Sequence, residues 1–589
     1  MNRLNSVAAL GLLLAVGLAG CSDPVTSSPG TVLEPTFADA GTAAVPGRVL
    51  LDEVDDISGA NHQQLVTKIQ SRFPNAQIEP TGLAEETHIY RVTVEPNQTE
   101  ELMNLVRSES TVEHVEPSFQ IEPYFEPNDP MYQEQWGMKK IHTESSWNYS
   151  AGRGAVVAVI DTGVACETRD GFKKLSDLEQ TQCVPGWNFV SGHDHAYDDH
   201  GHGSHVAGTI AQSTNNNLGG VGVAYQVRIM PIKVLAAQGG GTSENVADGI
   251  RWAADHGAQV INMSLGSSQR SAVIEDACTH AYKKGVTIVA AAGNSGPNNN
   301  TVGYPAGYDH VIAVSAIDST GKITSFSSRG KQVDIGAPGA AIMQQTVTPG
   351  GKGEQYATWN GTSMASPHVA GVAALVVSMG VNDPDAVEEI LKESSESNEV
   401  TDGNPQLYGA GLLDASAAMR KVVIQQGLTK LGLLALFSGI LYYFLRRKEE
   451  NSAQASMLSL ESKLVKSLFF VPALLSSVGF FFLPMLGLHL PMAFTRPLFD
   501  LDLTLGMNVH QWLPLATTLI PAGLTVLTWK WSIARILNGG LAMGSATYLA
   551  SILALGGIWN PLGFIFQGWI ALNLVGSMAL AYWNLKERI

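Results

Sequence analysis

Three short segments of this 589-residue chain carry side chains that can act together in catalysis. Asp161 lies in the segment VIDTG, His202 begins the segment HGSHVAGT, and Ser363 lies in the segment GTSMASPHVAG. A serine hydroxyl becomes a strong nucleophile when a histidine takes its proton and an acid orients that histidine. A serine, a histidine and an acid in these three segments could therefore act together in covalent catalysis by the serine.

The first two segments each have a second interpretation when they are taken alone. Asp-Thr-Gly is also the motif of aspartic proteases, but that mechanism needs two carboxylates that share a proton. The chain contains no second Asp-Thr-Gly and no Asp-Ser-Gly. A cluster of histidines is typical of zinc sites, and the cluster here consists of His193, His195, His200, His202 and His205. The segment around Ser363 favours a general base at His202 over a metal ligand.

Apolar strands and helical patterns must bring these residues together. Five apolar runs rich in β-branched residues are expected to be strands, at residues 156–161, 227–235, 259–265, 286–292 and 311–317. Helical patterns such as 243–256 lie between them. Strands that are apolar on both faces are typical of a parallel sheet covered by helices, with the active site at the carboxyl ends of the strands. Ser363 is expected at a helix N-terminus, which favours an oxyanion.

Together the three segments resemble the subtilase family of serine peptidases. The resemblance covers residues 130–420 and, through a small α+β region, residues 46–129. It implies an α/β fold with a subtilisin-like parallel sheet flanked by helices, and the activity of an endopeptidase. In that activity Ser363 attacks the scissile carbonyl, His202 moves the proton and Asp161 orients the imidazole.

The resemblance also implies how the substrate and the oxyanion are held. Asn294, in the segment AAGNS, matches the oxyanion-hole residue of the family, with the backbone N–H of Ser363 as the second donor. The peptide would lie as an extended strand. The residues that match its binding segments are Gly239, Gly240, Gly241, Ser264, Leu265, Gly266, Gly303 and Tyr304. No acid stands where a Lys or Arg side chain would bind, so an apolar or aromatic preference is expected.

A structural calcium ion is the cofactor that the resemblance implies. Carboxylates, amides and carbonyls are its usual ligands, and the matching residues are Asp129, Asp177, Thr214, Asn216, Leu218 and Gly220. The alternative is a set of unrelated surface polar groups. The second calcium loop of thermitase-like members is not expected, because Asn188, Ser191 and His193 stand in place of its acids.

The N-terminus is typical of an exported lipoprotein. Arg3 precedes an apolar run too short to span a bilayer, and the segment LAGC ending at Cys21 resembles a lipobox. This predicts a signal peptide at residues 1–20 and a lipid on Cys21, with an ordinary secretory signal as the alternative. Residues 21–45, rich in Ser, Pro, Thr and Gly, are expected to be a flexible tether.

The other three cysteines have separate expected roles. Cys166 and Cys183 would form a disulfide in an oxidising compartment, with two free thiols as the alternative. Cys278 lies in a helical pattern and is expected to be buried.

Charge and hydropathy separate the front of the chain from the back. Residues 1–421 have a net charge of −22 and residues 422–589 a net charge of +5. The net negative charge of residues 1–421 argues against a nucleic-acid partner, because phosphate binding needs clustered Lys and Arg. Five apolar stretches in the back predict an all-α transmembrane bundle, at residues 428–445, 467–488, 511–529, 536–557 and 562–583. Lys and Arg gather at one side of these stretches, which predicts a cytoplasmic C-terminus.

The sequence therefore predicts an extracytoplasmic serine endopeptidase anchored in a bacterial cell membrane. After the signal and the tether, its expected parts are an inhibitor-like propeptide (46–128), a catalytic domain (129–421) and a membrane domain (427–589). The expected partners are protein or peptide substrates, the chain's own propeptide as an inhibitor, and membrane lipid. Self-cleavage between about Phe119 and Asn128 would release the propeptide. A pseudoprotease that binds peptides is the alternative, although no triad or oxyanion residue is lost.

Overall fold

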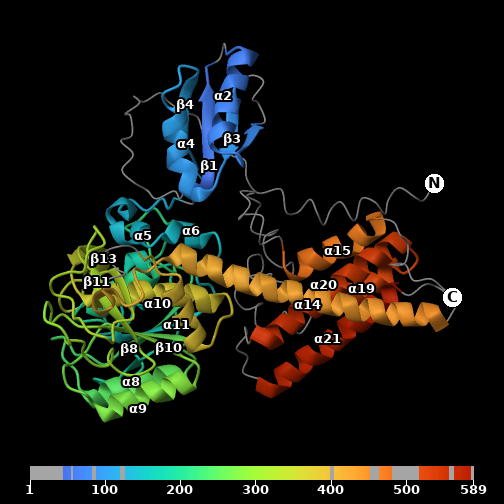
Figure 1. The fold of residues 1–589 in the computed structure, drawn as a ribbon. Helices are drawn as coiled ribbons and strands as arrows, with labels where there is room; N and C mark the ends of the chain where they lie inside the picture. The colour runs from blue at the N-terminus through green and yellow to red at the C-terminus, as the bar shows by residue number, and fades with distance from the viewer. Residues whose placement is uncertain are drawn as a thin grey trace. The chain divides into compact units, whose positions relative to one another are not determined.

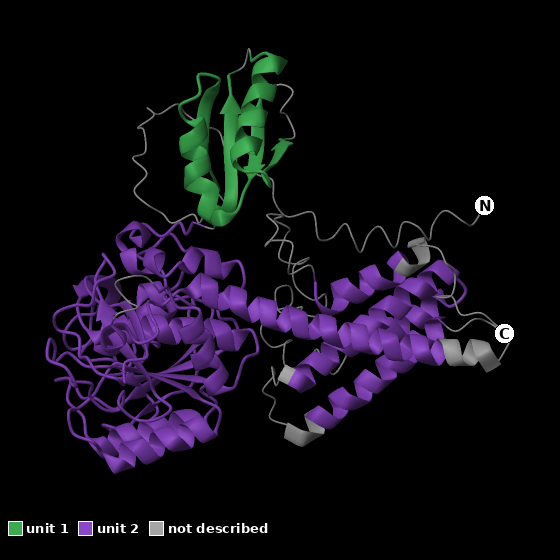
Figure 2. Ribbon diagram, viewed as in Figure 1, with its two compact units in different colours: residues 1–121 green, residues 122–589 purple. Residues whose placement is uncertain are grey.

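Two compact units make up the chain, residues 1–121 and residues 122–589, and each is described by itself (Figure 2). The structure is a computed structural model that describes residues 44–54, 57–81, 88–119, 126–397, 404–451, 463–479, 517–555 and 563–585. The predicted signal peptide, most of the tether, Cys21 and residues 120–125 of the predicted cleavage segment lie outside the described residues.

The first unit is a small α+β sandwich, as the sequence predicts. Its four antiparallel strands follow the order β2-β3-β1-β4. The elements are β1 (Ala44–Glu53), α2 (Gly59–Arg72), β2 (Gln77–Pro80), β3 (Ile89–Thr93), η1 (Pro96–Gln98), α4 (Thr99–Val106) and β4 (Val112–Phe119) (Figure 1). Val49 and Val92 of the strands pack against Ile69 of α2 and Leu102 of α4. The sequence missed β2, an edge strand whose side chains are mostly exposed.

A parallel sheet forms the centre of the second unit and confirms the predicted α/β fold. Its strand order is β12-β11-β10-β9-β5-β8-β6, and β7 also pairs with β8. The strands are β5 (Val156–Asp161), β6 (Gln182–Cys183), β7 (Trp187–Asn188), β8 (Arg228–Lys233), β9 (Val260–Met263), β10 (Thr287–Ala291), β11 (Ile312–Ile317) and β12 (Ile335–Pro338). Every residue of β5, β9, β10 and β11 is buried, since helices cover both faces.

Successive residues of β5 face two different apolar cores. Val157 and Val159 pack with helices α7 and α10, whereas Ala158 and Ile160 pack with α8 and α9. The helices of this part are α5 (Trp136–Lys140), α6 (Thr143–Trp147), α7 (His202–Ala211), α8 (Ser243–Asp255), α9 (Ala272–Lys283), α10 (Thr362–Ser378), α11 (Pro384–Glu393) and α13 (Pro405–Tyr408). Two short 3-10 helices, η2 (Tyr132–Glu134) and η3 (Ser176–Leu178), and an antiparallel hairpin of β13 (Ile342–Val347) and β14 (Glu354–Trp359) complete it.

The C-terminal region is helical, and its elements overlap the five predicted apolar stretches. They are α14 (Ala415–Asn451), α15 (Lys463–Ser477), α19 (Leu519–Thr528), α20 (Ser532–Leu555) and α21 (Gly563–Leu585). Within the described residues, two helical segments are long and apolar enough to cross a membrane, Ala415–Leu445 and Ser532–Ala554. Parts of the other predicted stretches lie outside the described residues.

Candidate active site

Asp161 and His202 form a hydrogen-bonded pair at the carboxyl end of the central strand. Asp161 is the last residue of β5 and His202 is the first residue of α7. Nδ1 of His202 lies 2.7 Å from Oδ1 of Asp161. The carboxylate is fully buried and also accepts the N–H of Thr162 at 2.7 Å. Because a carboxylate accepts, Nδ1 carries the proton and Nε2 is left as the atom that can take one.

The surroundings of His202 act on its pKa in opposite directions. Burial, the largest single influence, lowers the pKa, while the charge and hydrogen bond of Asp161 and the charge of Asp198 raise it. The net result is a pKa raised above the ordinary value of 6.5. An imidazolium is therefore stabilised at this position, as a general base requires after it has taken a proton.

Asp198 is a site residue that the sequence analysis missed. It is almost completely buried, and its two oxygens accept four hydrogen bonds at 2.8–3.0 Å. The donors are the N–H groups of His200, Gly201 and Ser204 and the hydroxyl of Thr162. The first N–H groups of a helix have no carbonyl partner of their own, so Asp198 fixes the start of α7 and with it His202. An acid four residues before the histidine was the available signal.

Ser363 is the second residue of α10, as the sequence predicts for a nucleophile at a helix start. Its hydroxyl donates to the carbonyl of Ser264 at 3.1 Å, and the hydroxyl of Ser264 donates to the carbonyl of Ser363 at 2.7 Å. The hydroxyl of Ser363 thus has a hydrogen-bond acceptor in Ser264, the residue that follows β9. Catalytic hydrogen bonds commonly tighten only when substrate binds, so we expect the hydroxyl to turn from Ser264 to His202 at that stage.

Asn294 follows β10 and is held by the residue before the nucleophile. Its Oδ1 accepts the backbone N–H of Thr362 at 2.9 Å and the hydroxyl of Thr362 at 3.0 Å. A backbone N–H can only donate, so this contact identifies the oxygen of the amide and leaves Nδ2 as a donor. A Cβ at Gly361 would lie 3.4 Å from Nδ2, so glycine keeps the space before this donor open. Thr362 was not singled out from the sequence.

Two of the three predicted substrate segments lie side by side. Ser267 exchanges two hydrogen bonds of 2.8 Å with Tyr304, which brings the segment that follows Ser264 against the Gly303–Tyr304 segment. A Cβ at Gly266 would stand 3.0 Å from the carbonyl oxygen of Tyr304. Residues 239–241 form a partly exposed turn beside the histidine loop, where a Cβ at Gly239 would lie 3.2 Å from Nε2 of His200. Ser264 itself contacts Ser363, whereas the 303–304 segment lies against the residue three positions after Ser264 and the 239–241 segment lies beside His200, two residues before His202.

The predicted calcium ligands converge around two buried carboxylates. Asn216 donates its backbone N–H to Asp129 at 3.4 Å and its Nδ2 to Asp177 at 2.8 Å. The N–H of Gly220 donates to Asp177 at 3.1 Å. Leu218 donates its N–H to Oδ1 of Asn216 at 2.9 Å, within the same loop, which begins near Thr214. The described residues contain no cluster of three acid, histidine or cysteine side chains that could hold a metal.

Burial, with a smaller contribution from the negative charge of Asp129, raises the pKa of Asp177 to about 6. Hydrogen bonds from Asn216, Gln212 and Gly220 act in the opposite direction and lower this pKa. Burial likewise raises the pKa of Asp129. Two adjacent carboxylates that resist ionisation fit a divalent cation, because such an ion would favour the charged form of both. With only two acids, amide and carbonyl oxygens must supply the other ligands.

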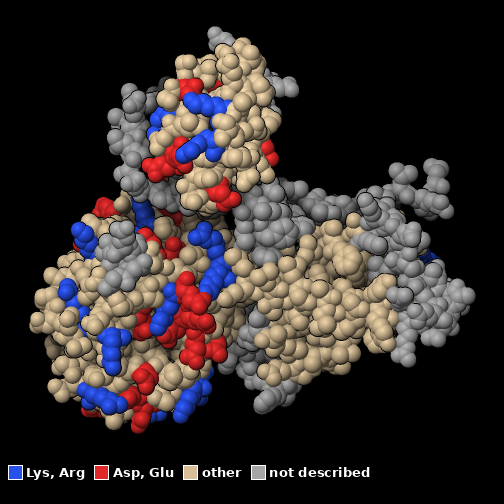
Figure 3. All heavy atoms as spheres, in the orientation of Figure 1, with Lys and Arg blue, Asp and Glu red and all other residues tan. Residues whose placement is uncertain are grey.

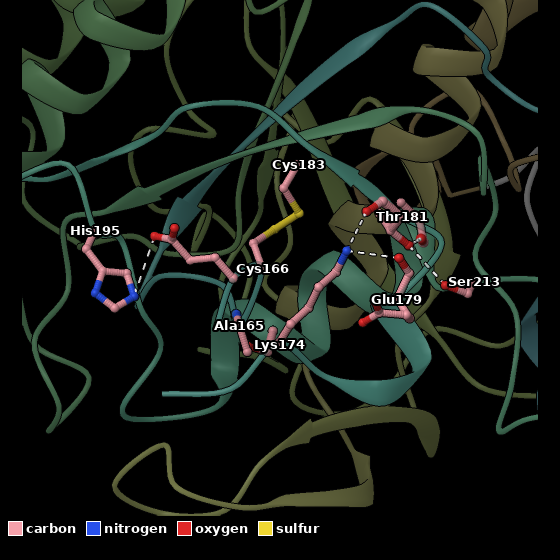
Figure 4. Close-up of a disulfide and its surroundings, with 11 residues drawn as sticks. Ala165, Cys166, Lys174, Glu179, Thr181, Cys183, His195 and Ser213 are labelled. Carbon is pink, nitrogen blue, oxygen red and sulfur yellow. Dashed lines mark hydrogen bonds and ion pairs between the residues drawn. A yellow bond between two sulfur atoms is a disulfide. The ribbon is translucent and has the colours of Figure 1, made fainter. Parts of the chain in front are cut away.

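A disulfide joins the segment after Asp161 to strand β6 (Figure 4). The sulfur atoms of Cys166 and Cys183 are 2.02 Å apart. Beside it, Nζ of Lys174 donates to the carbonyl oxygens of Glu179 and Thr181 at 3.0 and 3.1 Å. The loop is therefore closed twice, covalently and by hydrogen bonds. Cys278 is a buried free thiol in α9, and burial raises its pKa to about 12.

The histidines of the cluster have different partners. His202 faces Asp161, whereas Nε2 of His205 lies 3.1 Å from the carbonyl oxygen of Ala357 and its ring stacks on Trp359 at 4.4 Å. Burial lowers the pKa of His205 to about 3, so this ring stays neutral. His195 instead lies 3.5 Å from the carboxylate of Glu167.

A buried Asp–His pair, a serine at a helix start and an amide donor beside it, all at the carboxyl edge of a parallel sheet, define a serine hydrolase site. Known proteins agree with this class. The family model described as "Subtilase family" matches residues 152–411. The chain is 34% identical over 388 residues to the "Thermophilic serine proteinase" of Bacillus sp. (strain AK1), covering 65% of this chain and 91% of that protein.

Two further relatives match over the catalytic part. Thermitase of Thermoactinomyces vulgaris is 41% identical over 257 residues, which is 44% of this chain and 87% of that protein. Subtilisin DY of Bacillus licheniformis is 41% identical over 269 residues, which is 45% of this chain and 91% of that protein. The chain belongs to the subtilase family and is a subtilisin-type serine peptidase.

Proposed function

We propose that this chain is a membrane-anchored, extracytoplasmic endopeptidase that cleaves proteins through an acyl-enzyme on Ser363. The observation that carries the catalytic proposal is the 2.7 Å contact between His202 and the buried Asp161, at the same sheet edge as Ser363. This pair leaves Nε2 of His202 as the base and supplies the negative charge that stabilises it once protonated.

The mechanism follows from these positions. As the hydroxyl of Ser363 attacks the scissile carbonyl, its proton passes to Nε2 of His202 and the carbonyl oxygen becomes an oxyanion. Nδ2 of Asn294 and the backbone N–H of Ser363 stabilise that oxyanion. His202 then gives its proton to the leaving amine, and the peptide bond breaks. A water molecule repeats the sequence on the ester and regenerates the hydroxyl of Ser363.

Peptide hydrolysis by the purified full-length protein tests this proposal. Ser363→Ala is expected to remove turnover almost entirely, because no other group can form the ester; in subtilisin itself the loss is about 10⁶-fold. Ser378→Ala, at the other end of the same helix, should keep activity within about threefold. Its hydroxyl bonds to Ser150 and to the carbonyl of Leu375, so its loss acts on stability, at about 1 kcal/mol per hydrogen bond, and not on the chemistry at Ser363. Equal activity of the Ser363→Ala and wild-type proteins would refute the proposal.

Membrane anchoring is supported by the C-terminal helices. In the view of Figure 3, their described surface carries almost no charged side chains, whereas both signs of charge are spread over the catalytic part. Large apolar side chains such as Leu428, Leu527 and Trp583 are more than half exposed, which lipid tails would cover. Deleting residues 427–589 should move the mature protease to the soluble fraction, and retention of that form in the membrane would contradict the anchor.

Self-activation is the third part of the proposal. The sandwich of residues 44–119 has its own apolar core and belongs to a unit that ends before the catalytic fold, as a removable inhibitor requires. Cleavage between about Phe119 and Asn128 would leave the lipid of Cys21 on the propeptide side. N-terminal sequencing of the mature protein locates the cut, and normal processing of isolated Ser363→Ala protein would contradict self-cleavage.

Calcium would be held by Asp129, Asp177 and Asn216, together with backbone carbonyls of the loop at residues 214–220. Its contribution would be structural, because it would join the segment before η2 to the loop that follows α7. The burial of both carboxylates beside Asn216 supports such a cation.

A further inference from the structure

Helix α14 is a single helix that belongs to two different cores. It runs from Ala415 to Asn451 without interruption (Figure 1). Its N-terminal part packs with the helices that surround the catalytic site, and its later turns pack with the other C-terminal helices. The chain therefore passes from one core to the other without leaving helical conformation.

The first turns of α14 are built into the catalytic core. The N–H of Ala415 donates to the carbonyl of Ile141 at 2.8 Å, and Asp414 accepts the N–H of Ala417 at 2.8 Å, which caps the helix. Four side chains on the inner face of these turns are completely buried in the core that also contains α7 and α10, namely Ala415, Ala418, Met419 and Val422.

Polar contacts extend this attachment by one more turn. Lys421 pairs with Glu393 at the end of α11, and the side-chain amide of Gln426 donates to the carbonyl of Met379. Met379 caps the C-terminus of α10, the helix whose first turn carries Ser363. The far end of the nucleophile's helix is thus bonded to α14.

Immediately after Gln426 the same helix becomes apolar and exposed on its outer face. Leu428, Leu436 and Tyr443 are 60%, 56% and 57% exposed, while Leu434 and Leu441 are buried against the other C-terminal helices. A bend at this point would have to break backbone hydrogen bonds, because each N–H of an α-helix donates to the carbonyl four residues earlier. Gly427 weakens the junction by only about 1 kcal/mol relative to alanine.

We infer that α14 fixes the catalytic site at a set height above the membrane, so that the enzyme selects membrane-tethered polypeptides by the distance between their scissile segment and the bilayer. This inference rests on the proposed membrane anchoring and catalysis. A flexible tether would let the site reach substrates over a wide range of heights. A continuous helix instead gives the catalytic site a high effective concentration around substrate segments at one height above the bilayer. At heights that the site cannot reach, its effective concentration is almost zero.

Full-length protein in lipid vesicles, mixed with membrane-anchored substrates, tests the inference. Each substrate carries the same cleavable peptide on a transmembrane helix, separated from it by Pro-rich spacers that lengthen by about 3.1 Å per residue. The wild-type rate should peak at one spacer length and fall at least about tenfold on either side. Equal rates at all spacer lengths would overturn the inference.

Two insertions between Gln426 and Gly427 make the test specific. Seven helix-forming residues add two turns, about 10 Å, and nearly preserve the rotation of the helix, so the optimum should move by about three spacer residues. Seven Gly and Ser residues should broaden the optimum instead. An optimum that stays in place in both variants would overturn the inference.

The same proteins supply the controls. All three should cleave the free soluble peptide with equal kcat/KM and remain with the vesicles on flotation. Loss of vesicle association or of soluble-peptide cleavage in the wild-type protein would instead refute the proposed function.

Discussion

Ser264 and Ser363 hold each other by two hydrogen bonds, each from the hydroxyl of one residue to the carbonyl of the other, at 3.1 and 2.7 Å. The two bonds differ in what they do. The hydroxyl of Ser264 fixes the backbone of Ser363, the proposed nucleophile, and with it the N–H that is proposed to face the oxyanion. The hydroxyl of Ser363 donates to the carbonyl of Ser264, and in the proposed mechanism it turns to His202 when substrate binds.

Asn262 extends this contact into the core of the sheet and provides the first prediction. It is fully buried, donates to Ser264 at 3.1 Å and accepts the hydroxyl of Ser366 at 2.7 Å. Asn262→Ala should remove the acceptor of Ser366 and one of the two hydrogen bonds of the Ser264 hydroxyl, lowering the free energy of unfolding by about 1–3 kcal/mol. Urea denaturation measures the loss, with the exposed Asn298→Ala as control. Equal stability of the two variants would show that the network does not support the site.

Asn294 provides the second prediction. Its amide oxygen is fixed by Thr362, so Nδ2 is the atom that is left to donate to the proposed oxyanion. Asn294→Ala should lower kcat by about 10²–10³ with little change in KM, because the hydrogen bond forms only in the transition state; this magnitude is the one known for subtilisin. A fall of less than threefold in steady-state peptide hydrolysis would remove Asn294 from the mechanism.

Asp198 provides the third prediction, on pH dependence. Only the neutral imidazole of His202 can take a proton, so kcat/KM should fall as the pH drops through the pKa of His202, which lies above 6.5. Asp198→Asn removes a negative charge that raises this pKa, and the acidic limb of the profile should therefore move to lower pH. Asp194→Asn, in an exposed carboxylate of the same loop, is the matched control. An unchanged limb in Asp198→Asn would mean that Asp198 acts only on stability.

Calcium removal provides the fourth prediction. Without metal, folded protein keeps the proton of Asp177 up to about pH 6, whereas the unfolded chain releases it near 3.8. Between these values the folded state binds more protons, so stability falls as the pH rises. Calcium favours the charged form, and it should therefore raise the Tm more at pH 7 than at pH 4.

Asp177→Asn should abolish this calcium effect and raise the Tm of the chelated protein at pH 7, because a neutral amide is easier to bury than a carboxylate. The exposed Asp309→Asn should respond to calcium like the wild type. Differential scanning calorimetry with calcium or chelator makes the comparison. A Tm at pH 7 that ignores calcium would contradict the site.

The sequence predicted those parts of the fold that have a long or regular pattern. Strand β5 and the start of α8 lie where their apolar patterns place them. The two-residue strands β6 and β7 are too short for any periodicity, and β13 carries buried polar residues such as Gln344, which hide a strand pattern. Composition also suggested a boundary between residues 421 and 427, where α14 continues, because hydropathy changes there while the backbone does not.

The candidate site divides in the same way. Asp161, His202 and Ser363 lie in local motifs, so their chemistry could be predicted without a structure. The residues that position them act through contacts between distant segments, such as the bond between Asn262 and Ser366, 104 positions apart. Such partners have no local signal, since either residue alone is typical of many buried positions.

The central claim is that Ser363 is an activated nucleophile, and covalent labelling tests it most directly. A fluorophosphonate reacts with a serine only when a neighbouring base takes its proton. Mature protein, freed of its propeptide, should gain one adduct, which mass spectrometry of its peptides should locate on Ser363. His202→Ala, whose propeptide is first removed by added wild-type enzyme, should lose that adduct while keeping its fold. A correctly processed wild-type protein with no adduct on Ser363, or with its adduct on another serine, would contradict the account.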